Sequence, residues 1–248
     1  MKIEKFKKLA NGRYQLSLDD GNTLQLYEEV ILKYELLLKK KIDNIDIPEI
    51  EEYNIEWDVY YTALKSLKSR FRSSYELRRL LLDKSYPIEL VDKAIQKLEE
   101  QKYLDDRSFT KGYINNQIVT SSRGPNRIIK DLVTKGIDKN IIYDEIGVFD
   151  EEIQKEKINK IIKISIKSNR TRGGMVLKNK IVNDLINNGY SYDIIQKVIN
   201  NYEFGNDSLL AKKEYDKLYK KLSRKYSGSE LAYKIKEKLY QKGLSYED

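Results

Sequence analysis

The sequence predicts a mainly α-helical protein made of tandem three-helix repeats, preceded by a small module that contains β-strands. After Trp57, apolar residues recur at fixed offsets from Ser85, Gly136, Gly189 and Gly243, which are 51, 53 and 54 residues apart. Self-similarity at a fixed period of this size is typical of helical arrays. The low content of helix breakers, 12 Gly and 3 Pro in 248 residues, favours long helices. We expect the helix-turn-helix-like repeats to form an elongated, curved array.

Residues 1–45 predict the β-containing module. Asn11-Gly12 is the preferred sequence of a two-residue type I′ hairpin, and Asp19 to Asn22 form a second turn signal. The apolar residues alternate with a period of two between these turns and change to a helical spacing after Glu28. We therefore expect a three-stranded meander followed by one helix, with strands over residues 2–8, 13–18 and 23–27. Residues 46–56 are charged, contain Pro48 and are expected to form an irregular linker.

The rest of the chain divides into three complete repeats and one incomplete repeat of two helices. Their expected bounds are residues 57–106, 107–150, 151–205 and 206–248. The first helix of each repeat is expected near residues 58–70, 106–122, 152–170 and 207–226. The fourth repeat stops before its third helix, either because the chain ends there naturally or because it has been shortened.

Each repeat carries the same pattern around its second helix. Four and eight residues before the reference position stand apolar residues, which share one face of a helix. The reference residue suits a left-handed position that ends the helix, where Gly is preferred. Asp138, Ser191 or Ser245 then stands where it can cap the next helix. In the third and fourth repeats, the break before the second helix lies further from these apolar residues than in the first two repeats. This predicts a second helix about one turn longer in the third and fourth repeats.

Composition excludes several classes of function. The chain has 47 Lys and Arg against 39 Asp and Glu, a formal net charge of +8, and it contains no His and no Cys. Disulfides, zinc sites of Cys and His, and catalysis by a His base are therefore excluded. The chain shows no apolar signal core and no run long enough to span a membrane, so we expect a cytoplasmic protein without a membrane partner.

The positive charge is unevenly distributed. Residues 1–56 hold nine basic and twelve acidic residues, whereas residues 57–248 hold 38 basic and 27 acidic residues. An excess of 11 positive charges after residue 57, strongest beyond residue 154, favours a polyanionic partner.

Basic residues cluster at the turns between helices and on the last long helix. They could contact phosphate groups, which the planar guanidinium group binds well, or they could equally be a solvated helix surface. The candidate residues are Arg70, Arg72, Arg78, Arg79, Arg123, Arg127, Lys130, Arg170, Arg172, Lys178, Lys180, Lys213, Lys220 and Arg224.

Two of these clusters surround glycine-containing breaks at the same place in neighbouring repeats, Gly124-Pro125 and Gly173-Gly174. A helix that begins at such a break could bind an anion through its free N–H groups. The alternative, that Gly124-Pro125 simply ends one helix and starts another, is favoured by about two to one.

Two other features have structural explanations that we prefer. Asp105-Asp106 could be a metal-binding carboxylate pair but is better explained as the cap of the helix that follows. Trp57 and the 20 Tyr residues could stack on bases, although most Tyr residues stand at apolar repeat positions and are expected to pack in the core. No Walker-type loop or dinucleotide-binding glycine pattern occurs, so we expect no cofactor and no metal.

These residues resemble the RecX family, the bacterial regulators of the RecA recombinase. The resemblance covers residues 57–204 well and the rest more loosely. It rests on Ala63, Leu64, Leu67, Arg70, Arg72, Ser73, Glu76, Leu77, Leu81, Lys84, Leu98, Leu104, Asp105, Asp106, Phe109, Gly124, Ile128, Leu132, Lys135, Gly136 and Ile137. The sequence departs from the family at Ser85, where the family usually has Gly, and in the missing final helix.

The resemblance implies a non-enzymatic protein of tandem three-helix repeats. It also implies binding in the groove of a RecA–single-stranded DNA filament and inhibition of ATPase activity, strand exchange and filament stability. We further expect a monomer, and weaker binding to duplex DNA. Two hypotheses remain beside it. One is a tandem helix-turn-helix module that binds nucleic acid without RecA, and the other is a metal-dependent nuclease that uses Asp105 and Asp106.

Overall fold

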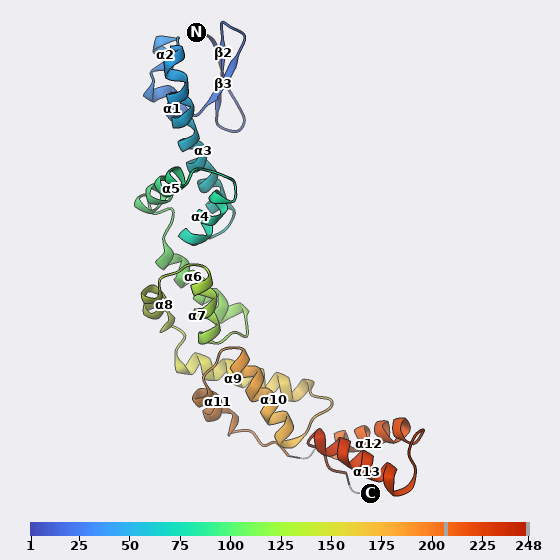
Figure 1. Ribbon diagram of the computed structural model, residues 1–248. Helices are drawn as coiled ribbons and strands as arrows, with labels where there is room; N and C mark the ends of the chain where they lie inside the picture. The colour runs from blue at the N-terminus through green and yellow to red at the C-terminus, as the bar shows by residue number, and fades with distance from the viewer. Residues whose placement is uncertain (206–207, 247–248) are drawn as a thin grey trace. The chain divides into compact units, whose positions relative to one another are not determined.

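The computed structural model describes residues 1–205 and 208–246, and it is mainly helical with a small sheet at the N-terminus (Figure 1). The sheet contains β1 (Ile3–Lys8), β2 (Tyr14–Leu18) and β3 (Thr23–Leu26) in the order β1-β2-β3, and both pairs of strands are antiparallel. The inward-facing residues Leu16, Leu18 and Leu26 are buried. The predicted meander and mainly helical fold are therefore confirmed.

The first turn of the sheet differs from the predicted two-residue hairpin. The amide of Leu9 donates to the carbonyl of Arg13, and the amide of Gly12 donates to the carbonyl of Leu9. Three residues therefore lie in the loop, and among Ala10, Asn11 and Gly12 only Gly12 has a positive φ, of 84°. A type I′ turn needs positive φ at both central residues, and Asn11 stays on the right-handed side.

Residues 47–56, expected to be an irregular linker, are the first part of a long helix. After α1 (Glu28–Lys33), α2 (Leu36–Lys39) and a 3₁₀ turn (Asn44–Asp46), α3 runs over Ile47–Ser69. Pro48 lies in the first turn of α3, where a missing N–H group breaks no helical hydrogen bond. Ile50 is buried in the core of the N-terminal module, so tertiary packing holds this charged segment in a helix.

The remaining helices form repeats as predicted. We name α3 with α4 (Ser74–Leu82) and α5 (Ile88–Glu100) repeat 1. Repeat 2 contains α6 (Asp106–Thr120), α7 (Pro125–Thr134) and α8 (Lys139–Ile146), and repeat 3 contains α9 (Glu151–Ser168), α10 (Gly174–Asn187) and α11 (Tyr192–Ile199). Repeat 4 contains α12 (Ser208–Leu222) and α13 (Gly228–Gln241). The second helices have 9, 10, 14 and 14 residues, which confirms the extra turn in repeats 3 and 4.

The pattern around each second helix is also confirmed. The apolar residues four and eight positions before the reference are buried in every repeat: Leu77, Leu81, Ile128, Leu132, Ile181, Leu185, Ile235 and Leu239. The reference residues Ser85, Gly136, Gly189 and Gly243 all have positive φ, between 64° and 94°. Asp138 caps α8 through its carboxylate, and Ser191 is at the cap of α11 without a side-chain bond. No helix follows Ser245 within the described residues.

The chain forms two compact units. The first contains residues 1–109 and 135–137, and the second contains residues 110–134 and 138–248. In the first unit, the core of the N-terminal module and the core of repeat 1 are separate clusters, and Trp57 and Tyr61 on α3 pack against both. Asp58 on the same helix accepts hydrogen bonds from Arg13 and Tyr27 of the module and from Tyr86 of repeat 1.

Successive repeats meet at joints of one type. At the joint in the first unit, Lys135, Gly136 and Ile137 pack on the start of α4. The buried hydroxyl of Ser73 donates to the carbonyl of Lys135 at 2.6 Å, and the Lys135 Nζ donates to Glu76 Oε1 at 2.8 Å. Glu76 also completes a capping box with Ser73. Lys135, the residue before the left-handed Gly136, therefore bonds to the residues that cap α4 in repeat 1.

Two joints in the second unit use the same register with backbone atoms alone. The amide of Gly124 donates to the carbonyl of Asn188 at 2.7 Å, and the amide of Gly173 donates to the carbonyl of Lys242 at 2.8 Å. A Cβ atom at Gly124 would lie 2.7 Å from the carbonyl carbon of Gly189, far inside van der Waals contact. Glycine is required at these joints because two backbones touch.

Candidate nucleic-acid interface

The helix N-termini at the glycine-containing breaks are occupied by the protein itself. The amides of Gly124 and Asn126 donate to Asn188 and Gly189, and the amides of Gly173 and Gly174 donate to Lys242 and Gly205. These N–H groups are therefore not free to bind a phosphate, and the anion-site interpretation of the two breaks is wrong. The alternative of a structural turn is favoured, with the added finding that each turn joins two repeats.

Several predicted contact residues are used in ion pairs within the protein. Arg78 makes a two-point contact with Asp92, at 2.7 and 3.2 Å. Arg123 pairs with Asp131, which also lies 3.8 Å from Arg127. The remaining pairs are Arg70 with Glu76 and Lys180 with Asp184. A cation that already has a carboxylate partner gains less from a phosphate, because the partner's charge offsets the attraction.

Three further candidates bond to neutral groups. The Nη1 of Arg170 donates to the carbonyls of Lys167 and Asn169, and Lys178 donates to the side chain of Asn200 at 3.2 Å. Arg72 is partly buried, and its Nε has no hydrogen-bond partner within the described residues. Burial, followed by the charge of Arg70, lowers the pKa of Arg72. None of these three side chains makes an ion pair within 4 Å among the residues the structure describes.

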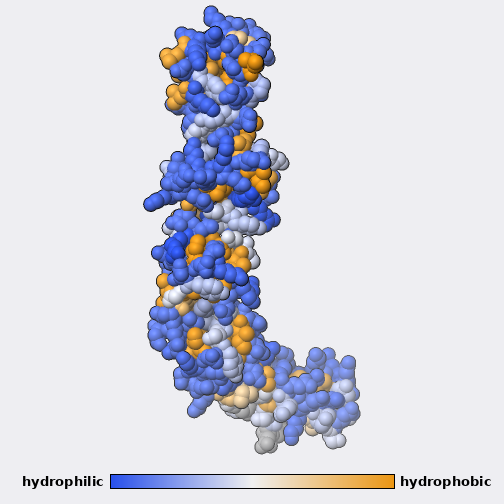
Figure 2. Space-filling view, turned by 60° about the vertical axis from the view of Figure 1, so that its left-hand side comes forward, coloured by the Kyte–Doolittle hydropathy of each residue, from blue (hydrophilic) through white to orange (hydrophobic). Residues whose placement is uncertain are grey.

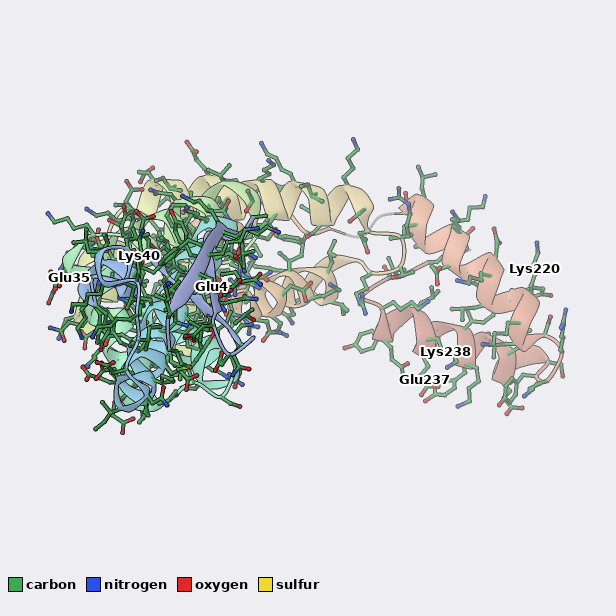
Figure 3. The ribbon with its side chains drawn as sticks, turned by 90° about the horizontal axis from the view of Figure 1, so that it is seen from above. Glu4, Glu35, Lys40, Lys220, Glu237 and Lys238 are labelled. Atoms are coloured by element: carbon green, nitrogen blue, oxygen red, sulfur yellow. The ribbon has the colours of Figure 1, made fainter. Side chains whose placement is uncertain are left out.

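The other candidates are exposed cations without an ion pair among the residues the structure describes: Arg79, Lys130, Arg172, Lys213, Lys220 and Arg224. Lys213 and Lys220 lie on α12, opposite the buried Leu218 and Leu222, and Arg224 lies in the turn that follows the helix. We call these three cations a basic row. Figure 3 shows Lys220 on α12, with Glu237 and Lys238 on the neighbouring α13. The basic face predicted for this helix is thus present and directed to solvent.

A second row of free cations was missed in the sequence. Lys160, Lys163 and Lys167 are exposed on α9, opposite the buried Ile158 and Ile162, and they make no ion pair within the described part of the chain. Their spacing of three and four residues is the signal that could have found them. They lie in the C-terminal half of α9, where the helix dipole favours positive charge.

The lysine row of α9 is flanked by two depressions in the surface of the second unit. One, of about 250 Å³, lies between the end of α6 and the α9 residues Lys157 and Lys160. The other, of about 270 Å³, is lined by Ser165, Ser168, Arg170 and Arg172. Lys157 is directed to the last carbonyls of α6, including Ser121 at 2.8 Å, and burial lowers its pKa. Hydroxyl and cationic groups beside a lysine row are suitable contacts for a sugar–phosphate chain.

The candidate carboxylates and aromatic residues have structural roles. Asp105 accepts hydrogen bonds from the amides of Arg107 and Ser108 and caps α6, while Asp106 accepts from the amide of Ser74 at the start of α4. Burial raises the pKa of Asp106. Trp57 packs against Tyr53, Tyr60 and Tyr61, as expected for a core residue. For most Tyr residues the core interpretation is wrong, because among the described residues Tyr27, Tyr60 and Tyr190 are the buried ones. Across residues 1–205 and 208–246, no group of three or more carboxylates is placed to hold a metal ion.

The described residues also contain no helix long and apolar enough to cross a membrane. Residues 60–98 match the family model described as RecX, first three-helix domain. The chain is 31% identical to the regulatory protein RecX of Lactococcus lactis subsp. lactis over 99% of this chain and 93% of that protein. The chain belongs to the RecX family. It is also 29% identical to the regulatory protein RecX of Bacillus subtilis, over 96% of this chain and 92% of that protein.

Two solved structures of the family share the fold. The crystal structure of a regulatory protein RecX has a TM-score of 0.68 and 25% identity, and covers 81% of this chain and all of that chain. The structure of RecX from Lactobacillus salivarius has a TM-score of 0.57 and 26% identity, and covers 60% of this chain and 97% of that chain. The relatives are named as regulatory proteins and not as enzymes.

Proposed function

We propose that this protein binds the filament that the RecA recombinase forms on single-stranded DNA and inhibits its activity without catalysing a reaction. The observation that carries the proposal is the pair of basic rows. One is Lys160, Lys163 and Lys167 on α9, and the other is Lys213 and Lys220 on α12 with Arg224 in the turn after it. Six exposed cations without carboxylate partners in one compact unit are suited to the phosphates of a nucleic acid strand. Membership of a family of regulatory proteins supports a regulatory outcome of that binding.

The ion pairs make the proposal more specific than net charge does. Arg78, Arg123 and Lys180 are held in ion pairs, so phosphate contact is assigned to the two rows and to free residues such as Lys130 and Arg172. The joints bond the second helices of repeats 2 to 4 to one another through backbone atoms, and α9 and α12 each pack on the other helices of their own repeat. The rows are therefore presented on rigid elements, which limits the entropy lost on binding.

The test is the ATPase activity of RecA on single-stranded DNA while this protein is titrated in. We expect inhibition at or below one molecule per recombinase subunit. Replacing Lys160, Lys163 and Lys167 by Glu should weaken inhibition at least tenfold. It should also reduce the salt dependence of binding to single-stranded DNA by a slope of about two, since each phosphate contact contributes about 0.7.

The matched control replaces Lys5, Lys7 and Lys8 by Glu, three exposed lysines of β1. It makes the same change in net charge and should leave both readouts within about twofold of the wild type, because general attraction alone is weak at physiological salt. Equal losses in the two variants would contradict a local interface. DNA binding without any effect on RecA would favour the alternative of an independent nucleic-acid-binding module.

A further inference from the structure

The N-terminal module exposes leucines on a strained turn. Leu32 at the end of α1 and Leu37 and Leu38 in α2 are 62%, 51% and 82% exposed, whereas the neighbouring Leu36 is 2% exposed and anchors the turn. Figure 2 shows apolar patches among hydrophilic surface at its top, where this module lies. Single exposed leucines are ordinary in proteins, but three within seven residues are not.

The backbone around α2 is held in a conformation that L-residues avoid. Glu35 and Lys40, on either side of α2, have φ of 54° and 50°, in the left-handed region (Figure 3). Neither is Gly or Asn, so each costs on the order of 1 kcal/mol or more. Strain of this kind persists only where the surrounding structure imposes it, and it is concentrated at functional positions.

The first strand imposes this conformation. The amide of Ile3 donates to the carbonyl of Lys40 at 2.9 Å, and the amide of Ile42 donates to the carbonyl of Met1 at 2.9 Å. The charged N-terminus returns a bond to the carbonyl of Ile42 at 2.8 Å. With Leu36 buried on one side and β1 clamping the other, Leu37 and Leu38 are held facing solvent. The clamp prevents the turn from rotating to bury them.

We infer that Leu32, Leu37 and Leu38 form a docking patch for a protein, one whose surface offers an apolar pocket with carboxylates at its rim. The neighbouring Lys40 and Lys41 are exposed and make no ion pair within the described residues, so they call for carboxylate partners. Leucine side chains gain no hydrophobic free energy from contact with a phosphate chain. The patch is therefore suited to a protein surface and not to nucleic acid. A single turn with two leucines is too small to hold a membrane surface.

The inference rests on the proposed function in one respect, because the protein partner it names is the recombinase subunit of the filament. The basic rows and the leucine patch then divide the binding between them. The rows contact the nucleic acid of the filament, and the patch contacts its protein.

The test measures affinity for two targets, single-stranded DNA alone and the RecA filament on the same DNA. The double variant Leu37→Ser, Leu38→Ser should bind bare DNA as the wild type does and bind the filament at least tenfold more weakly. Lys40→Glu with Lys41→Glu should weaken filament binding about threefold to tenfold. Val148→Ser is the control, because Val148 is 51% exposed, like Leu37, but lies between α8 and α9.

Each other outcome overturns the inference. Wild-type and leucine-variant proteins that bind the filament equally would leave the proposed function standing and remove the docking patch. Equal losses on bare DNA and on the filament would place the patch in nucleic-acid binding. If light scattering gave a larger mass for the wild type than for the leucine variant, the occupant would be a second copy of the chain. If the wild type sedimented with phosphatidylglycerol vesicles and the leucine variant did not, the occupant would be lipid. A wild type that binds no filament removes the proposed function and the patch's partner together.

Discussion

The joint in the first unit and the joints in the second unit solve the same packing problem with different atoms. At each joint, a carbonyl of one repeat accepts a hydrogen bond from the repeat before it. The carbonyl belongs to the residue just before the left-handed reference position, and the donor belongs to the residue that caps the second helix. In the first unit the donor is the hydroxyl of Ser73, and in the second unit it is the amide of Gly124 or Gly173. A serine at this position adds a capping box and the ion pair of Glu76 with Lys135, which the glycine joints lack.

The difference shows what a repeat needs and what it can vary. The register of the contact is kept at all three joints, because it satisfies a carbonyl at the end of one helix and a donor at the start of another. The chemistry varies, since either a side chain or a close backbone approach can provide the donor. Side-chain joints depend on charge and therefore on pH, whereas glycine joints depend on the absence of a Cβ atom.

The largest effect is expected for Gly189→Ala. Gly189 has φ of 94°, and a Cβ atom there would overlap the backbone nitrogen of Arg127, which cannot move without breaking the joint. Strain and overlap together should lower the free energy of unfolding by about 3 kcal/mol or more. Urea unfolding followed by circular dichroism measures the change. Gly205→Ala is the control, because nothing lies within 4 Å of its Cβ position, and a similar loss there would contradict the joint.

Ser73→Ala should have the next largest effect. It removes the cap of α4 and leaves the carbonyl of Lys135 without its donor, at a site where Ser73 is fully buried. The expected loss is about 2 kcal/mol in the free energy of unfolding. The control Ser69→Ala removes an exposed hydrogen bond to the carbonyl of Ser66 and should change stability by less than about 0.5 kcal/mol. If the two variants were equally stable, neither the cap nor the side-chain joint would contribute to stability.

The charged joint should make stability depend on pH. Burial would raise the pKa of Glu76, but the hydrogen bond and charge of Lys135, with the Ser73 amide and Arg70, outweigh it and lower the pKa below its ordinary 4.5. A carboxyl whose pKa is lowered by folding stabilises the folded state above its unfolded pKa and loses that contribution as pH falls through the folded value.

The stability difference between wild type and Glu76→Gln should therefore be constant above about pH 5 and shrink as the pH falls below 4.5. Urea unfolding from pH 7 to pH 3 measures it. Lys135→Met should remove most of the same pH dependence, because it removes the partner. A difference that does not change over this range would show that Glu76 acts only as a cap.

The sequence predicted the repeats well because their signals are local. Apolar spacing, the left-handed reference residue and the following cap all lie within about twenty residues, and each depends on helix geometry alone. The three-residue loop at Gly12 was missed because Asn11-Gly12 suits two hairpin types that differ by one residue. The helix over residues 47–56 was missed because its stability comes from Ile50 packing on the N-terminal core, which no local pattern shows.

The candidate site could be predicted in composition but only partly in position. The excess of positive charge in residues 57–248 is a property of the sequence, and the basic face of α12 follows from spacing. Which cations are free depends on carboxylates far along the chain or on another turn, as for Arg78 with Asp92. The free amides assumed at Gly124 and Gly173 were wrong because their partners lie 64 and 69 residues away, in the next repeat.

The smallest effect is expected at the reference position that no earlier repeat packs against. Ser85 has φ of 64° and is exposed, and its turn is tied to α3 through Tyr86, whose hydroxyl bonds to Asp58 at 2.8 Å. The side chain of Ser85 is exposed, so we expect conformational strain to be the main cost of this residue. Ser85→Gly should raise the free energy of unfolding by less than about 1 kcal/mol, since relief of strain is partly offset by the greater entropy of an unfolded Gly. A loss of stability measured by urea unfolding would show that Ser85 makes a contact of its own and that this turn, too, is a joint.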